Sequence, residues 1–301
     1  MKLPPDFVRN IRSAFGKAGE QWLTDLPSLL AEAANKWHLT LGPALPLSYN
    51  YVTMAKRSDG LDVVLKIGVM NQEVESELTA LRYFAGEACV HLLEADDEKC
   101  MFLLEQLKPG EMLASVKDDE KRTHIACDIM TELWRPAPDD ASLIRLTDWF
   151  TAYSKLRTRF DGTSGPIPKA LFERAEELIS KLFAQAGPSF LIHGDLNHFN
   201  ILSSGSRWLA IDPKGVIGPP EFECGPLLIN PWPYLAYQHD AIKITRRRMD
   251  IFNERLGFPR ELTRDWGFCH AILSVCWDLA EDGTGGEYSL ACAEIIWRAG
   301  N

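Results

Sequence analysis

The stretch that decides the fold reads Leu191-Ile192-His193-Gly194-Asp195-Leu196-Asn197-His198-Phe199-Asn200-Ile201-Leu202, and Asp212 follows at the end of a second apolar run. Apolar segments on both sides of a polar centre predict short strands joined by a loop. The loop therefore brings two carboxylates, Asp195 and Asp212, and the amide oxygen of Asn200 to one region. Such oxygen ligands suit Mg²⁺, which shares its coordination sphere with substrate phosphates. An aspartate on this loop can also accept a proton from an attacking hydroxyl group.

This string resembles the catalytic loop of the kinase fold, His-x-Asp-x-x-x-x-Asn. The resemblance implies that Asp195 is the catalytic base and that Asn200 and Asp212 are metal ligands. Asp212 opens the element Asp212-Pro213-Lys214-Gly215, where protein kinases carry Asp-Phe-Gly. Gly194 stands where protein kinases carry arginine, and the form His-Gly-Asp looks like that of the antibiotic phosphotransferases. The alternative, that these residues only cap turns and end a strand, is disfavoured by the length of the matching string.

A lysine within an apolar strand is the second element of the resemblance. Lys66 stands in Val63–Ile67, which is similar to the Val-Ala-Ile-Lys element of kinases. A charge inside such a strand needs a partner, which in the resemblance is a helix glutamate. Glu73, Glu75 and Glu77 are available, and Glu77 fits the family pattern best, with Glu73 as the alternative. Lys66 would then also hold the α- and β-phosphates of the nucleotide.

Two further segments resemble the parts of a kinase that hold the nucleotide. Phe102–Leu107, followed by Lys108-Pro109-Gly110, looks like the adenine-binding hinge. We assign the acceptor there to the carbonyl group of Glu105 and the donor to the amide of Leu107. The stretch Leu47–Thr53 matches the phosphate-covering loop but contains no glycine, the residue that lets backbone amides approach phosphates closely. Within that stretch, Ser48 could donate to a phosphate oxygen and Asn50 could adopt a left-handed conformation.

Four other strings are similar to the aminoglycoside/hydroxyurea antibiotic resistance kinase family. They are Leu133–Pro136, Trp208–Gly215, Leu228–Pro231 and Trp277–Gly283. The resemblance covers most of the chain and implies ATP and Mg²⁺ as cofactors and a hydroxylated small molecule as acceptor. The chain departs from the family pattern after Gly218, where Glu223 replaces an expected aspartate. We expect Glu223 to anchor the loop with an altered local geometry.

The order of the predicted elements, together with the resemblance, predicts an α+β, two-lobed, protein-kinase-like fold. Residues 1–107 would form a small antiparallel-sheet lobe that binds nucleotide and carries a helical N-terminal extension. Residues 108–301 would form a larger, mainly helical lobe for catalysis and substrate binding. Strands are expected from Tyr49 onward, with a helix at Glu73–Phe84. Helices of the larger lobe are expected over roughly 118–135, 145–160, 168–186, 240–255 and 260–281.

Composition excludes several classes of protein. The 301 residues carry 32 Lys and Arg against 42 Asp and Glu, a net charge of −10. This acidic balance argues against a dedicated nucleic-acid binder, which would need a basic face. We find no apolar run long enough to span a membrane and no signal peptide. Seven cysteines without zinc-binding spacing indicate reduced thiols and a cytoplasmic protein.

The acceptor is the least constrained part of the interpretation. Four aromatic residues have two alternative interpretations: they line a sugar-binding face, or they belong to the core of the helical lobe. They are Trp134, Trp232, Tyr234 and Trp277. Three acidic residues also have two interpretations: they receive ammonium groups of the substrate, or they lie at a solvated helix end. They are Asp278, Glu281 and Asp282. The basic run Arg246–Arg248 is expected to form a solvated helix face.

Three functional hypotheses follow from these observations. The first is an ATP-dependent phosphotransferase that acts on a hydroxyl group of an aminoglycoside such as streptomycin. The second is a catalytically weak nucleotide-binding pseudokinase, which the glycine-free loop favours. The third is a kinase for a different metabolite alcohol. The oligomeric state stays open at this stage.

Overall fold

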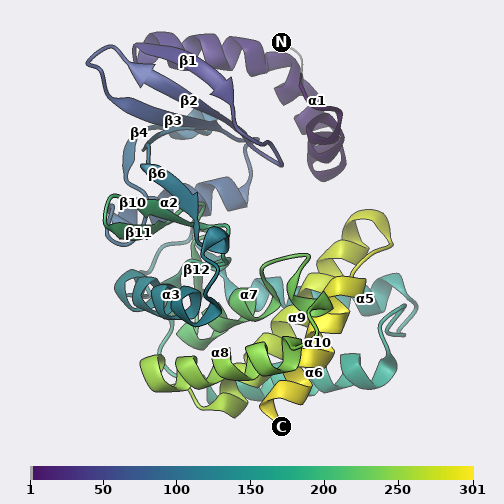
Figure 1. Ribbon diagram of the computed structural model, residues 1–301. Coiled ribbons are helices and arrows are strands. Elements are labelled where there is room, and N and C mark those ends of the chain that lie inside the picture. The colour runs from purple at the N-terminus through teal and green to yellow at the C-terminus, as the bar shows by residue number, and fades with distance from the viewer. Residues whose placement is uncertain (1–2) are drawn as a thin grey trace.

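The computed structural model describes residues 3–301, the side chains of Glu281 and Asp282 excepted. It has a smaller lobe built on a sheet and a larger lobe built mainly of helices (Figure 1). This arrangement confirms the predicted α+β class. The predicted division at residues 107 and 108 stays a prediction. Among the described helices, none combines the length and the apolar character that a membrane span requires.

A five-stranded antiparallel sheet forms the smaller lobe, in the order β1-β2-β3-β5-β4. Its strands are β1 (Leu39–Ala44), β2 (Tyr51–Arg57), β3 (Asp62–Ile67), β4 (Leu92–Asp96) and β5 (Met101–Glu105). The prediction that strands begin at Tyr49 was wrong, because β1 precedes it and includes Pro43. Proline is tolerated there because β1 is an edge strand, where a missing N–H group breaks no ladder.

The two faces of this sheet are covered by different helices. Because side chains alternate along a strand, Met101 and Leu103 pack toward α1 (Pro5–Lys36), whereas Phe102 and Leu104 belong to the core beneath α2 (Gln72–Phe84). Helix α2 starts where the side chain of Asn71 accepts a hydrogen bond from the amide of Val74. The same alternation places Lys66 of β3 on the α2 face of the sheet.

Helix α1 confirms the predicted helical segment at the N-terminus, but it is kinked. Gly16 has φ 53° and ψ −127°, and the residues before it turn down toward the larger lobe (Figure 1). Such a conformation is accessible to glycine and strained for other residues. The helical spacing of the apolar residues could not reveal this kink, because apolar positions recur on both sides of it.

The larger lobe is built around α9 (Arg260–Asp282). Its other helices are α3 (Asp119–Leu133), α4 (Leu146–Trp149), α5 (Thr151–Arg159), α6 (Lys169–Gln185), α7 (Cys224–Ile229), α8 (Ala241–Leu256) and α10 (Glu287–Gly300). Helix α9 lies against α5, α6, α7, α8 and α10. The predicted helix over 145–160 is divided at Phe150 into α4 and α5. Helices α7 and α10 were not predicted. Fully buried aromatic side chains such as Trp266 and Phe222 fill the core around α9.

Two small sheets of the larger lobe carry the loop with the predicted catalytic residues. One pairs β11 (Arg207–Ala210), β10 (Ile201–Ser204) and β6 (Pro109–Met112). The other pairs β7 (Arg135–Pro136), β9 (Phe190–Ile192), β12 (Val216–Gly218) and β8 (Ile144–Arg145). The loop His193–Asn200 therefore leaves one sheet and enters the other, and the segment around Asp212 crosses back.

The expectation of a solvated face at Arg246–Arg248 was wrong for Arg248, which is 1% exposed. Its guanidinium group pairs with Asp119 at the start of α3 at 2.5 Å and donates to the carbonyl groups of Leu227 and Asn230, each at 2.6 Å. Arg248 thus joins α8 to α3 and to the end of α7. A run of three arginines gives no sign of this, since the partner lies 129 residues away.

Replacing Arg248 with methionine should lower the free energy of unfolding by about 3–5 kcal/mol, because Asp119 would keep a buried charge with one cation fewer. Arg247→Met is the matched control, since the ion pair of Arg247 with Glu120 is partly exposed and should contribute less than about 1 kcal/mol. Urea unfolding at pH 7 measures both variants. Equal losses in the two variants would contradict this account.

The same pair predicts a pH dependence. Burial alone would raise the pKa of Asp119, but Arg248 and Arg122 lower it to about 2. A carboxyl group with a lowered pKa stabilises the fold above its unfolded pKa of about 4, and that contribution disappears as the pH falls toward 2. The stability difference between the wild type and Arg248→Met should therefore shrink over this pH window, and a constant difference would be evidence against it.

Candidate active site

The catalytic-loop string is held in place by hydrogen bonds to the segment that carries Asp212. The Nε2 of His193 lies 2.9 Å from the carbonyl oxygen of Ile211, and the amide of Lys214 donates to the carbonyl group of His193 at 2.7 Å. The amide of Ile211 donates to the carbonyl group of Asn200 at 2.9 Å. These bonds place Asn200 beside Asp212, and through them His193 braces the loop.

Two asparagine side chains orient the carboxylate of Asp195. The Nδ2 of Asn197 donates to its Oδ1 at 3.0 Å, and the Nδ2 of Asn200 donates to its Oδ2 at 3.1 Å. Burial raises the pKa of Asp195 above the ordinary value. Because Asn200 uses its nitrogen atom on Asp195, its oxygen atom is the one that can ligate a metal. No role was assigned to Asn197 from the sequence, and this hydrogen bond brings it into the site.

Glu223 anchors the start of the catalytic loop, as the sequence analysis expected. Its fully buried carboxylate accepts hydrogen bonds from the amides of His193 at 3.2 Å and Gly194 at 2.7 Å. Burial raises the pKa of Glu223 to about 8. Gly194 has φ +88°, and a Cβ atom there would lie 2.6 Å from the side chain of Val216. A side chain at this position is therefore excluded on both conformational and steric grounds.

A buried ion cluster links the two lobes. The Nζ of Lys66 contacts the Glu77 carboxylate at 2.5 and 2.7 Å and also contacts the Oδ1 of Asp212. Burial alone would lower the pKa of Lys66, but Asp212 and Glu77 outweigh it and raise that pKa. This geometry selects Glu77 over Glu73 as the partner of Lys66.

Ser76 reinforces this link and was missed by sequence reasoning. Its hydroxyl group donates to the carbonyl group of Gly215 at 2.6 Å and accepts from the amide of Ile144 at 3.1 Å. A Cβ atom on Gly215 would lie 2.5 Å from the carbonyl oxygen of Ser76, so only glycine allows this approach. Serine next to the motif glutamate carries no distinctive sequence signal, because its partner is a backbone group from the other lobe.

Asp212 stands between two lysines. It has φ 60°, an uncommon conformation for a residue other than glycine or asparagine, of the kind that clusters at functional sites. Its Oδ2 lies 3.4 Å from the Nζ of Lys214. Burial alone would raise the pKa of Asp212, but Lys214 and Lys66 hold it far below the usual range. Lys214 was quoted in the motif but given no role, although a cation two residues after the aspartate predicted to bind metal was the available signal.

A cleft of about 850 Å³ lies between the lobes. Its lining includes Ser48 from the loop between β1 and β2, together with Glu77, Asp212 and Lys214. Glu105 at the end of β5 and Leu107 beyond it lie outside this lining. The same holds for Lys66, which is buried, and for Asp195 and Asn200, which are partly buried. Asn50 also borders the cleft, but the expected left-handed conformation is absent, since Asn50 is not among the described residues with positive φ.

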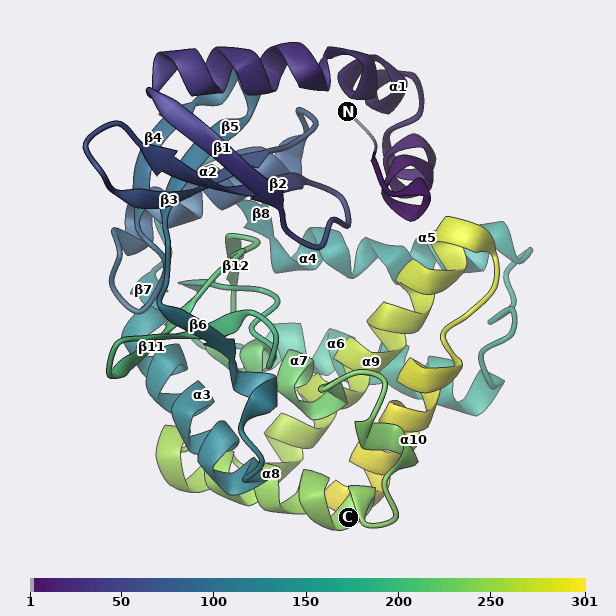
Figure 2. The same ribbon diagram turned by 45° about the horizontal axis from the view of Figure 1, so that its top comes forward.

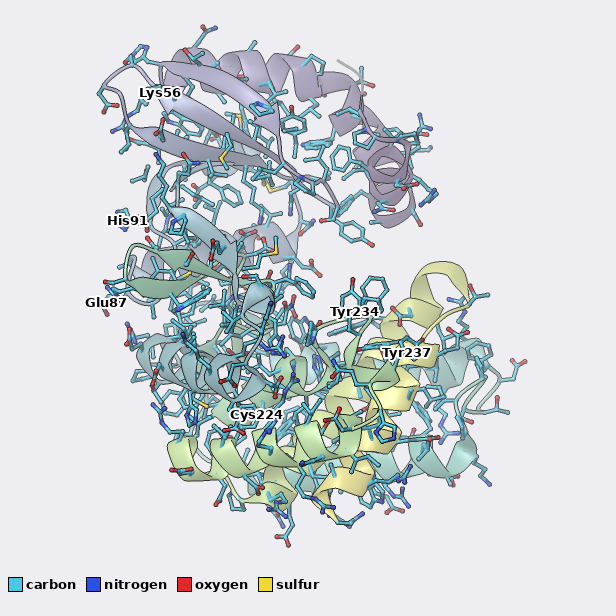
Figure 3. All side chains as sticks on the ribbon, viewed as in Figure 1. Lys56, Glu87, His91, Cys224, Tyr234 and Tyr237 are labelled. Atoms are coloured by element: carbon cyan, nitrogen blue, oxygen red, sulfur yellow. The ribbon has the colours of Figure 1, made fainter. Side chains whose placement is uncertain are left out.

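Only some of the aromatic and acidic candidates for the acceptor site lie in this cleft. Trp277 and Asp278 of α9 line the cleft. Trp134 packs against Phe258 with ring centroids 5.7 Å apart, which favours its alternative as a core residue. Trp232 and Tyr234 are exposed on the segment after α7, and Figure 3 shows Tyr234 on the side of the larger lobe that faces the sheet. The side chains of Glu281 and Asp282 lie outside the described residues.

The oxygen donors of the site fit Mg²⁺. Across the described residues, no group of three His, Cys, Asp or Glu side chains could hold a metal ion. Asn200 and Asp212 together offer oxygen ligands only. Such a pair suits an ion that takes its remaining ligands from phosphates and water, as Mg²⁺ does. The residues present therefore fit Mg²⁺ better than they fit zinc, which favours nitrogen and sulfur ligands.

Comparisons with known proteins agree with this geometry. A family model described as aminoglycoside/hydroxyurea antibiotic resistance kinase matches residues 36–283. Streptomycin 6-kinase of Streptomyces glaucescens is 30% identical over 288 residues, which cover 94% of this chain and 92% of that protein. Hydroxyurea phosphotransferase of Kitasatospora aureofaciens is 30% identical over 315 residues, with coverages of 98% and 86%.

A solved structure supports the fold. It is an aminoglycoside phosphotransferase in a ternary complex with ADP and hygromycin B, with a TM-score of 0.63 at 13% identity, covering 90% of this chain and 98% of that one. This likeness confirms the predicted kinase-like fold. The family model spans well over half of the chain, and the resemblance stated from the motifs is confirmed. The chain therefore belongs to the aminoglycoside/hydroxyurea antibiotic resistance kinase family and is a small-molecule kinase.

Proposed function

We propose that this chain transfers the γ-phosphoryl group of ATP to a hydroxyl group of a cationic small molecule, an aminoglycoside such as streptomycin. The observation that carries the proposal is the contact of Lys66 with both Glu77 and Asp212 across the lobes, next to an oriented Asp195. Identity of 30% to a streptomycin 6-kinase supports the choice of acceptor, as do the acidic residues of the cleft.

Asp195 accepts the proton of the acceptor hydroxyl group. Asn197 and Asn200 hold its two oxygen atoms, so that the carboxylate meets the acceptor hydroxyl group in a fixed orientation. As the acceptor oxygen bonds to the γ-phosphorus, the bond from that phosphorus to the bridging oxygen breaks and ADP leaves. The hydroxyl proton passes to Asp195. Positioning of this kind supplies a large share of the catalysis in phosphoryl transfer.

The phosphates meet cations from both lobes. Lys66, braced by Glu77, would hold the α- and β-phosphates, and Lys214 would face the γ-phosphate. Ser48 would add a hydroxyl donor from the glycine-free loop. The hinge would bind adenine through the carbonyl group of Glu105 and the amide of Leu107.

Asn200 and Asp212 would hold Mg²⁺. A bound Mg²⁺ supplies neutralisation of the phosphate charge. Lys66 and Lys214 both contact Asp212, so two cations stand at the place where the phosphates would bind.

Turnover on a panel of acceptors tests the proposal. The protein, ATP and Mg²⁺ are incubated with streptomycin, other aminoglycosides, hydroxyurea and neutral alcohols, and the products are identified by mass. Phosphorylated streptomycin is the expected product. Phosphorylation of neutral alcohols alone would support the metabolite-alcohol alternative, and nucleotide binding without any product would support the pseudokinase.

We infer that the protein works in the cytoplasm. All seven cysteines are free and buried, which suits a reducing compartment. ATP is the proposed phosphoryl donor, and it is made and used in that compartment.

Asp195→Asn should lower kcat by roughly 10²–10⁴-fold, because an amide cannot accept the hydroxyl proton. The affinity for ADP should stay close to that of the wild type. Asp139→Asn at an exposed position is the matched control and should leave kcat unchanged. Steady-state kinetics on the identified acceptor measure the effect, and undiminished turnover by Asp195→Asn would refute the assignment.

Lys214→Met should weaken binding of the ATP analogue AMP-PNP by roughly 10–100-fold and leave the affinity for ADP within about twofold, because Lys214 would meet only the γ-phosphate. Lys66→Met should weaken both nucleotides. Calorimetry in the presence of Mg²⁺ measures both affinities. Equal weakening of ADP and AMP-PNP in Lys214→Met would show that Lys214 does not distinguish the γ-phosphate.

A further inference from the structure

The residues before the kink in α1 form a separate structural element, called here the N-terminal arm (residues 5–15). Gly16 ends the arm with a backbone conformation that other residues adopt only under strain. A Cβ atom on Gly16 would meet nothing within 4 Å, so backbone conformation and not space demands glycine there. The glycine at position 16 therefore allows the arm to lie at an angle to the rest of α1.

The arm is held firmly against the remainder of α1. Phe7 and Ile11 are fully buried, and the rings of Phe7 and Trp22 lie 6.1 Å apart in an edge-on arrangement. A Cβ atom on Gly19 would lie 2.5 Å from the carbonyl oxygen of Ile11. A second glycine thus permits the close approach, and the arm is a packed part of the small lobe.

The opposite face of the arm borders the cleft. Ser13, Ala14 and Phe15 share the cleft lining with Trp277 and Asp278 of α9. Figures 1 and 2 both show the arm above the C-terminal end of α9. The Nδ2 of Asn10 also donates to the carbonyl group of Ser48 at 3.4 Å, which ties the arm to the loop that would cover the phosphates.

The side of the cleft that the arm borders lies away from the hinge. In Figure 1, β6, which follows the hinge in the chain, lies on the left of the view, and the arm descends on the right. Asp212 and Lys214, where the phosphates would bind, line the same cleft as the arm, and Lys66 contacts Asp212. A nucleotide that reaches from the hinge to these lysines would leave the space beside the arm for the molecule that receives the phosphoryl group.

The groups around this space favour a cation with apolar surface. Asp278 and Glu73 bring carboxylates, and the partly exposed indole of Trp277 and the ring of Phe15 bring aromatic faces. Ammonium and guanidinium groups are attracted both by carboxylates and by aromatic faces.

We propose that the N-terminal arm forms one wall of the acceptor subsite, opposite Trp277 and Asp278, so that a cationic acceptor is bound between the two lobes. The inference rests on the proposed function. It assigns acceptor selection partly to Ser13–Phe15, outside the catalytic lobe.

Site-specific charge placement tests the inference. Ala14 lines the cleft, whereas Ala18 is also exposed on α1 but is absent from the lining. Ala14→Cys and Ala18→Cys each add one accessible thiol to a chain whose own cysteines are buried. Each variant is treated with a quaternary-ammonium methanethiosulfonate or with its sulfonate counterpart, and KM is measured for streptomycin and for ATP.

The cationic label on Ala14→Cys should raise the KM for streptomycin at least about tenfold, through repulsion and crowding at the subsite. The KM for ATP should stay within about twofold, the anionic label should have a smaller effect, and labelled Ala18→Cys should match the wild type. Identical behaviour of the two labelled variants, or a change confined to the KM for ATP, would overturn the inference while leaving the kinase intact. Failure of the wild type to phosphorylate streptomycin would overturn the proposed function, and the inference with it.

Discussion

The contact of Lys66 with both Glu77 and Asp212 is the interaction on which the rest of the structure depends. Its three members come from β3, α2 and the segment after β11, so a single ammonium group fixes the small sheet, its helix and the larger lobe to one another. A buried lysine is unfavourable without partners, and two carboxylates supply them. The hydrogen bonds of Ser76 to Gly215 and Ile144 run beside this cluster and hold the same two lobes together.

Around the cluster, the site is built from groups that are already oriented. Glu223 accepts two backbone amides at the start of the catalytic loop, and Asn197 and Asn200 hold the carboxylate of Asp195. Arg248 supports the far side of the lobe by joining α3, α7 and α8. Little reorganisation of these groups would then be needed when a substrate binds, which is the source of catalytic power in such a site.

Motif chemistry made the centre of the site predictable from the sequence. Asp195, Asn200, Asp212 and Lys66 could be predicted to meet because the chemistry of phosphates and metals sets their residue types and spacings. The structure brings them together, and their individual roles are proposals. Ser76 and Arg248 were not found, because their partners are backbone groups or distant residues that no local pattern specifies. The kink at Gly16 was missed for a related reason, since helical periodicity continues through it. Strand β1 was missed because its position at a sheet edge, where Pro43 breaks no ladder, became apparent only in three dimensions.

The most direct measurement of the central claim is a crystal structure with AMP-PNP, Mn²⁺ and streptomycin, in which anomalous scattering locates the metal. The account predicts Mn²⁺ between the Asn200 oxygen and the Asp212 carboxylate, Lys66 on the phosphates, and a streptomycin hydroxyl group between Asp195 and the γ-phosphorus. Metal bound elsewhere, or a nucleotide whose phosphates lie away from Lys66 and Asp212, would contradict it.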